Sequence, residues 1–407
     1  MLRILHAIAS VNPASGGPLE GVRQISKINR GFGHEPEILS LDSPDEPWVN
    51  KLEYKVHAMG PSFTSYGYSP KLVPWLKANA QNYDVVIVNG IWSYNCFGVW
   101  CALRNTGIPY YVYTHGMLDP WFKYRYPWKH AKKWLFWPWA IFPILRDARG
   151  VFFTCDEERV LARKSFWLYD CNEIVVNYGT PGVPDSGKDY AATFLEKHPE
   201  LKCFRRFVFL GRVHPKKGPD LIIKAIARLR ESGDWDSKTM RLVMAGPADG
   251  AYAEKLKMLS RAEGVEDDIV WTGMLVGDDK WGALQCGEAF LLPSHQENFG
   301  IAVAESLSVG VPVLISKSVN IWSDIFSDGA GLADEDTLDG CVRIWRQWLQ
   351  MRPVERLEMG ARARACFQSR YTSRRAAVSM LSNIYQIMHS ERLDAARRAS
   401  DQRGIWE

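Results

Sequence analysis

Two carboxylates flank a short polar loop in the stretch Glu-Asn-Phe-Gly-Ile-Ala-Val-Ala-Glu, which runs from Glu297 to Glu305. The apolar run at 289–292 predicts a buried strand before the loop, and the residues after it favour a helix. Ligands of an open parallel sheet bind at the carboxyl ends of its strands, in front of the following helix. Unpaired amides at such a helix start favour phosphate. Here they belong to Asn298, Phe299, Gly300 and Ile301.

Phosphate bound between carboxylates that can grip hydroxyl groups is the chemistry of a nucleotide-sugar site. The alternative for this segment is a capped helix with two solvated carboxylates. A second loop, about 80 residues earlier, carries cations between an apolar run at 207–210 and a stretch with apolar residues at helical spacing. Arg212 offers a planar fork of donors and Lys217 a compact charge, and both suit a diphosphate. A solvated basic loop is the alternative here.

Together, the spacing Glu-x7-Glu around Asn-Phe-Gly and the Arg and Lys-Gly of the earlier loop resemble the retaining glycosyltransferases of family 4, the group 1 glycosyltransferases. The resemblance implies a GT-B fold of the α/β class. Its two Rossmann-like domains would face each other across a cleft, and the C-terminal helix would cross back to the first domain. The resemblance is strongest over residues 205–315.

The resemblance also implies roles for these residues. Arg212 and Lys217 would stabilise charge on the leaving diphosphate, Glu297 would hold sugar hydroxyls, and Glu305 would clasp the ribose. The loop containing Met274 would meet the nucleobase. We expect front-face attack in which the departing phosphate accepts the acceptor's proton. We expect no cofactor and no metal, because no Asp-x-Asp motif occurs in a donor loop.

The first half of the chain predicts a second parallel sheet, because apolar runs alternate with helical stretches. A segment rich in Pro, Gly and Ser at 180–188 favours a linker. We therefore expect an acceptor-side Rossmann-like domain at 1–185 and a nucleotide-sugar-binding domain at 186–372. The terminal helix, 373–407, would return to the first domain.

Two features of the first half suit substrate contacts. Gly16 and Gly17 precede a helix and could turn backbone amides towards phosphate, although the loop is not G-x-G-x-x-G and no nicotinamide site is indicated. The resembled family has a Gly-Gly loop here that closes over the donor diphosphate or the acceptor. It often has a His-Gly pair where His115 stands, near the transferred sugar. The alternatives are an ordinary tight turn and a histidine with a backbone partner.

The most unusual composition lies at 121–145, which holds five tryptophans and several basic residues but no acidic one. Basic residues mixed with large aromatics suit an interface with anionic lipid. An acceptor saccharide linked to a lipid diphosphate would fit such a surface. The alternatives are an aromatic helical cap and a site for an acidic acceptor. The residues assigned to acceptor or membrane are Trp121, Lys129, Lys132, Lys133 and Trp134.

Composition excludes several other classes. A net charge of +4, without a continuous basic element, argues against nucleic acid as a partner. The eight cysteines form no C-x-x-C pair, which argues against a disulfide framework or zinc site and suits a reducing cytoplasm. Residues 2–9 are too short and too weakly basic for a signal peptide, and no apolar run of about 18 residues predicts a membrane span. We expect a cytoplasmic protein, free or peripheral on the inner face of the cell membrane.

The function predicted is retaining transfer of a hexosyl group from a UDP- or GDP-linked sugar to a saccharide, in bacterial-type surface polysaccharide or glycolipid synthesis. One rival is another enzyme of the same fold, such as a nucleotide-sugar epimerase or a phosphorylase. The other is a catalytically silent, membrane-associated scaffold that binds nucleotide. The complete cationic and acidic set described above favours the transferase.

Overall fold

The computed structural model describes the backbone of residues 1–403 and the side chains as far as Asp394, apart from that of Ser15. The chain divides into two compact units. Unit 1 comprises Met1–Tyr178 and the chain from Ser373 on, and unit 2 comprises Gly179–Thr372. The segment at 180–183 belongs to unit 2, because Thr180 N donates to Tyr371 O and Val183 N donates to Ser308 Oγ. The division thus falls a few residues before the boundary at 185 expected from composition.

Unit 1 is built on a seven-stranded parallel sheet with the order β3-β2-β1-β4-β5-β6-β7. Its central strands are buried on both faces, which explains their continuous apolar runs. The strands are β1 (Arg3–Ile8), β2 (Glu35–Ser40), β3 (Val56–Ala58), β4 (Val85–Asn89), β5 (Tyr110–Tyr113), β6 (Gly150–Phe153) and β7 (Glu173–Val175).

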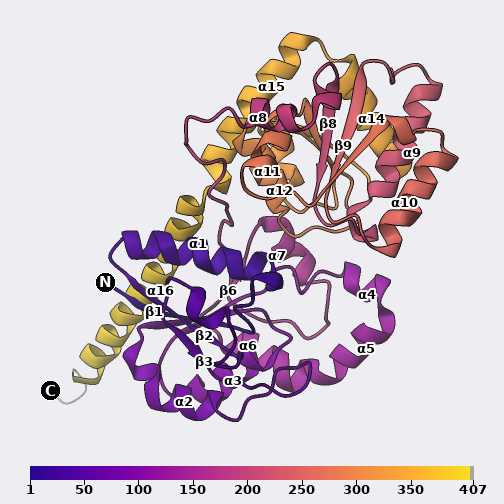
Figure 1. The fold of residues 1–407 in the computed structure, drawn as a ribbon. Coiled ribbons are helices and arrows are strands. Elements are labelled where there is room, and N and C mark those ends of the chain that lie inside the picture. Colours follow the sequence, from indigo (N-terminus) through magenta and orange to yellow (C-terminus); the bar gives the residue numbers. More distant parts are fainter. Residues whose placement is uncertain (404–407) are drawn as a thin grey trace. The chain divides into compact units, whose positions relative to one another are not determined.

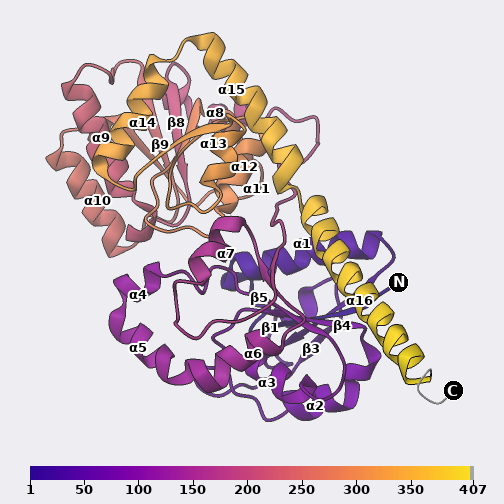
Figure 2. The same cartoon turned by 180° about the vertical axis from the view of Figure 1, so that it is seen from behind.

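Helices cover both faces of this sheet (Figures 1 and 2). Ile4 of β1 packs in a cluster with Met380 of the C-terminal helix, whereas its neighbour Leu5 packs in another cluster with Val99. The C-terminal helix therefore belongs to unit 1, as expected. The helices of this unit are α1 (Gly17–Gly31), α2 (Leu72–Asn79), α3 (Tyr94–Leu103), α4 (Trp121–Arg125), α5 (Pro127–Phe136), α6 (Phe142–Asp147), α7 (Asp156–Ala162) and α16 (Ser373–Arg403).

Unit 2 contains a six-stranded parallel sheet with the order β10-β9-β8-β11-β12-β13. The chain builds outward from β8 in one direction and then from β11 in the other, so the strand order reverses between these two neighbours. The strands are β8 (Arg205–Leu210), β9 (Met240–Ala245), β10 (Ile269–Gly273), β11 (Ala289–Leu292), β12 (Val313–Ser316) and β13 (Gly331–Asp334).

Helices also line both faces of the second sheet (Figures 1 and 2). Both units are therefore α/β with parallel sheets, which confirms the predicted fold class. No helix in the described part of the chain is long and apolar enough to cross a bilayer. The helices of unit 2 are α8 (Tyr190–Lys197), α9 (Pro219–Glu231), α10 (Ala251–Ala262), α11 (Gly277–Gln285), α12 (Ile301–Ser308), α13 (Trp322–Ser327), α14 (Leu338–Gln350) and α15 (Pro353–Cys366).

Candidate functional site

The two loops that carry the charged motifs of unit 2 follow β8 and β11, the strands between which the sheet order reverses. This reversal of strand order is the topological switch point of the sheet, and open parallel sheets bind ligands there. The loops touch, because His295 N donates to Lys216 O at 2.8 Å. At Gly218, φ is +65° and a Cβ atom would lie 2.3 Å from Pro293 O. Only glycine allows both this backbone conformation and this approach of the loops.

Lys217 and Glu297 form an ion pair across the two loops. Both side chains are mostly buried, with 16% and 18% of their surfaces exposed. The Glu297 backbone is fixed from a third loop: its N–H donates to Ser318 O, and its carbonyl accepts from Asn320 N, both at 2.9 Å. The residue predicted to bind phosphate and the residue predicted to bind the sugar are therefore in direct contact.

Arg212 lies exposed in the same loop as Lys217. Among the described residues, no hydrogen bond or ion pair engages its guanidinium. The pKa of His214 is lowered by burial and then by the charges of Arg212 and its two lysine neighbours. These three cationic side chains make the loop after β8 electropositive, as an anion site requires.

The helix α12 begins directly behind this pair. Its cap is Gly300, which has φ +76° and ψ +71°, a left-handed conformation that favours glycine. Phe299 is buried and packs edge-on against Tyr371, with ring centroids 5.5 Å apart. This packing anchors the segment between Glu297 and Ile301, where α12 begins. The Asn298 side chain accepts a hydrogen bond from Asn320 at 3.4 Å.

Glu305 lies one turn into α12 and is only 7% exposed. Lys280 of α11 donates to Glu305 Oε1 at 2.6 Å and lies over the ring of Trp281. Sequence reasoning missed Lys280. A buried carboxylate does require a counter-charge, but no spacing pattern indicates which lysine supplies it.

Met274, the predicted base contact, is 70% exposed. It follows β10, which lies two strands from β8 at the edge of the sheet. Among the described residues, no hydrogen bond joins Met274 to Lys217 or Glu297.

In unit 1, Gly16 and Gly17 form the turn into α1, after β1. Gly16 has φ +79°, and nothing lies within 4 Å of where its Cβ would be. The Tyr178 hydroxyl donates to Gly17 O at 2.9 Å and so links the turn to the segment that follows β7. A Cβ at Gly21 would lie 2.0 Å from that hydroxyl oxygen, so the close approach requires glycine there.

His115 lies in the loop after β5 and has φ +48°, which is rare for a residue other than glycine. Its Nε2 lies 3.2 Å from Asn89 Oδ1, and its ring stacks on that of Tyr113. Burial lowers the pKa of His115 to about 4, so the ring is neutral at neutral pH. Strained residues of this kind cluster at functional sites. The partner is a side chain, in contrast to the backbone partner considered above.

Sequence reasoning also missed Glu158, a buried residue of α7 that holds the His115 loop. Its Oε1 accepts from Thr114 Oγ1 and from Gly116 N, each at 2.6 Å. Its Oε2 accepts from both the amide and the hydroxyl of Thr154 at 2.7 Å. Glu158 lies in a run of three acidic residues at a helix start, and this pattern alone does not show which of them is buried.

The basic, tryptophan-rich segment divides between core and surface. Trp137 is fully buried and stacks on Phe166 with centroids 3.9 Å apart, whereas Trp128 is 85% exposed. Trp134 is half-buried and stacks on Trp167, and Trp121 contacts Tyr126 edge-on. Lys129 lies over Tyr126. The segment is therefore partly the aromatic cap considered above and partly an exposed surface.

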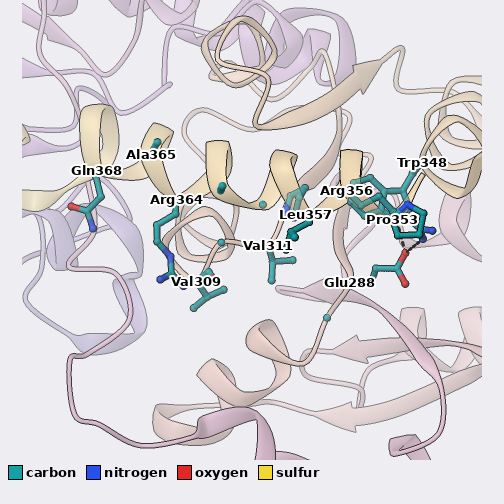
Figure 3. A pocket seen from close by; sticks show the side chains of 15 residues that line it. Glu288, Val309, Val311, Trp348, Pro353, Arg356, Leu357, Arg364, Ala365 and Gln368 are labelled. Atoms are coloured by element: carbon teal, nitrogen blue, oxygen red, sulfur yellow. Dashed lines mark hydrogen bonds and ion pairs between the residues drawn. The ribbon is translucent and has the colours of Figure 1, made fainter. Parts of the chain in front are cut away.

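Unit 2 also has a cavity of about 810 Å³ near the amino ends of β11 and β12 (Figure 3). It is lined by the residues that precede these two strands and by residues of α15. Arg356 and Trp348 converge there on Glu288, which also binds Arg205. These contacts satisfy the hydrogen bonding of the Glu288 carboxylate. The cavity lies away from the loops that follow β8 and β11. Among the side chains described, no three His, Cys, Asp or Glu residues are grouped to hold a metal ion.

Comparisons with known proteins match both units. The family model described as glycosyl transferases group 1 matches residues 193–365, and the one described as glycosyl transferase 4-like domain matches residues 16–177. A D-inositol 3-phosphate glycosyltransferase of Kineococcus radiotolerans is 28% identical over 167 residues, 38% of this chain and 38% of that protein. The match therefore spans well under half of that relative.

Solved structures resemble the chain over nearly its whole length. The sucrose-phosphate synthase of Thermosynechococcus elongatus has a TM-score of 0.76 at 18% identity, covering 96% of this chain and all of that one. The Anabaena protein Alr3699/HepE in complex with UDP has a TM-score of 0.75 at 15% identity, covering 95% and 100%. These likenesses, with the two parallel sheets, show a two-domain Rossmann-like GT-B fold.

Proposed function

Because the chain belongs to the group 1, family 4 glycosyltransferases, we propose that it transfers a hexosyl group from a UDP- or GDP-linked sugar to a saccharide acceptor, with retention of configuration. The Anabaena structure of the same fold was determined with UDP, which supports a nucleoside diphosphate as the leaving group.

The observation that carries the proposal is the contact between Lys217 and Glu297 at the switch point of the unit 2 sheet. In the structure, the two charges neutralise each other. A donor diphosphate offers Lys217 a stronger anion and leaves Glu297 to accept hydrogen bonds from sugar hydroxyls. Arg212 adds a fork of donors for the phosphate oxygens. The two cations then stabilise the charge that grows on the diphosphate as the glycosidic bond breaks.

Residues near this ion pair, together with two further loops, supply the remaining proposed contacts to the donor. The amides of residues 298–301 and the dipole of α12 face phosphate, as helix N-termini do. Glu305, with its counter-charge supplied by Lys280, accepts hydrogen bonds from the ribose hydroxyls. The loop of Met274 meets the base. The Gly16–Gly17 turn in unit 1 supplies backbone amides to the donor or the acceptor.

For the chemistry we propose front-face attack. The acceptor hydroxyl oxygen bonds to the anomeric carbon as the bond from that carbon to the phosphate oxygen breaks. The electron pair of the broken bond goes to the departing phosphate, which also takes the acceptor's proton. His115, neutral at neutral pH, contacts the transferred sugar as a hydrogen-bonding group and not as a base. No metal or cofactor takes part in this scheme.

The acceptor we propose is a saccharide linked to a lipid diphosphate, used in surface polysaccharide or glycolipid synthesis. The exposed aromatic side chains of the segment at 121–145, among them Trp128 and Trp139, support peripheral attachment to anionic membrane. The rival is a silent scaffold that binds nucleotide without turnover.

A thermal-shift panel with UDP, GDP, ADP and CMP, each with and without a divalent cation, tests the donor site. A ligand at 100 times its Kd adds about 2.7 kcal/mol, which raises Tm by about 2–4 °C. We expect a metal-independent shift with UDP or GDP alone. The absence of any shift would contradict the proposal, and a shift without sugar transfer would favour the scaffold.

A further inference from the structure

Unit 1 contains an aromatic cavity of about 670 Å³, and part of its wall comes from the basic, tryptophan-rich segment at 121–145. Its volume lies within the range of small-molecule sites, about 300–1000 Å³. Seven of its eleven lining residues are aromatic and two are lysines, Lys132 and Lys133, while none is acidic. The composition of the wall therefore suits a ligand that is largely apolar and carries negative charge.

The aromatic wall is open to solvent. Tyr68 is 46% exposed, Phe136 51% and Trp139 56%. A contiguous group of exposed apolar side chains often marks a binding site, whereas single exposed apolar side chains do not. The rings are also ordered against each other, since Tyr68 packs edge-on to Tyr94 with centroids 4.9 Å apart.

The positive charge at the cavity is not neutralised within the protein. Lys133 Nζ lies 4.1 Å from the ring centroid of Trp92, and Lys132 is exposed. Among the described residues, neither lysine forms an ion pair with a carboxylate. Burial, with a contribution from Lys129, lowers the pKa of Lys133 to about 8, and an anion beside it would reverse that shift.

The polar groups of the wall argue against a saccharide as the occupant. Trp139 Nε1 already donates to Leu135 O at 2.6 Å, and Trp92 Nε1 donates to Met117 O at 3.3 Å. No carboxylate or amide side chain lines the cavity. Only the hydroxyls of three tyrosines and the two lysines could replace a sugar's hydrogen bonds to water, whereas an alkyl chain needs no such replacement.

We propose that this cavity binds one molecule of an anionic amphiphile, with its apolar chain against the aromatic wall and its phosphate beside Lys132 and Lys133. The cavity adjoins the loop after β5, because Trp92 donates to Met117, two residues beyond His115. Identifying the amphiphile as the lipid part of the acceptor rests on the proposed function. The existence of the site does not.

The test is a titration of the whole protein with decyl phosphate below its micelle concentration, followed by tryptophan fluorescence. We expect saturable binding with a stoichiometry of one. Decyltrimethylammonium and inorganic phosphate should each bind at least about tenfold more weakly, because each lacks one of the two contacts. Equal binding of the cationic amphiphile would overturn the role of the lysines. Equal binding of phosphate alone, or displacement of the probe by maltose, would overturn the apolar site.

Matched variants localise the binding. Trp139→Ala and Lys133→Met should each weaken binding about tenfold, since they remove an aromatic wall and a charge. Trp167→Ala is the control, because Trp167 is 72% exposed, has no role in the proposals above and does not line the cavity. An equal loss in the control would mean adsorption to the surface and would overturn the site. Should a variant fail to fold, the comparison of probes on the unchanged protein still decides.

Nucleotide binding, measured on the same samples, separates this inference from the proposed function. A UDP or GDP shift without binding of decyl phosphate would overturn the cavity site alone. Binding of decyl phosphate without any nucleotide shift would overturn the transferase and leave the site standing.

Discussion

Lys217 pairs with Glu297 across the two loops that follow β8 and β11, where the strand order of the unit 2 sheet reverses. The pair joins a group suited to phosphate with a group suited to hydroxyls, about 80 residues apart in the chain. The two proposed roles predict that replacing either residue lowers turnover, while replacing Glu297 leaves nucleotide binding intact.

Lys217→Ala should lower turnover far more than it lowers stability. The side chain is proposed to stabilise charge in the transition state, and losing such a group costs on the order of 2–4 kcal/mol of barrier. Steady-state kinetics and Tm should be measured together. Lys216→Ala removes an equal charge one residue earlier, while its backbone carbonyl still binds His295. If that control loses as much activity, general electropositivity of the loop is sufficient and the specific role of Lys217 is wrong.

Glu297→Gln should abolish transfer and leave nucleotide binding intact. The variant keeps the shape of the side chain but releases Lys217 from its carboxylate, so affinity for UDP or GDP should stay the same or increase. Calorimetric titration of the nucleotide and an assay of sugar transfer give the two readouts. A marked loss of nucleotide affinity would assign Glu297 to the nucleotide and not to the sugar.

Much of the fold was predictable from the sequence, and the proximity of the charged loops follows from the strand order of the unit 2 sheet. Apolar runs alternating with helical periodicity require parallel sheets, and the carboxyl ends of neighbouring parallel strands meet at one edge. The loops after residues 210 and 292 therefore had to lie close together once β8 and β11 were neighbours. The family resemblance and the fold class are both confirmed.

The supporting residues were not predictable. Lys280 reaches Glu305 from another helix, and Glu158 reaches the His115 loop across about 40 residues of chain. Such contacts depend on how helices pack, which local patterns do not encode. The tryptophan-rich segment shows the same limit. Trp137 and Trp139 are two residues apart in one π-helical turn, Trp137–Ile141, yet one is in the core and the other on the surface.

Glu158→Gln should destabilise unit 1 and lower turnover without weakening nucleotide binding. The carboxylate accepts four hydrogen bonds, and an amide group can accept at only one of its two ends. A buried donor left without an acceptor costs about 1–3 kcal/mol. Glu157→Gln, a neighbour in the same helix, is the control. If turnover is unchanged in a folded Glu158→Gln protein, the His115 loop does not need this clamp.

The stability of unit 1 should fall as the pH drops from about 6.5 to about 4. Burial lowers the pKa of both His6 and His115 to about 4. Between that value and the ordinary value of about 6.5, the unfolded chain binds more protons than the folded one, so unfolding becomes easier as pH falls. Above pH 6.5 both states are neutral at these residues, and their contribution is constant.

Chemical denaturation across this pH range measures the slope, with His115→Asn as the matched variant. Asparagine tolerates the positive φ at position 115 but does not titrate. The variant should therefore show a shallower loss of stability between pH 6.5 and 4, while His6 keeps part of the slope. A pH dependence identical to that of the unchanged protein would mean that His115 titrates alike in both states and is not kept neutral by its surroundings.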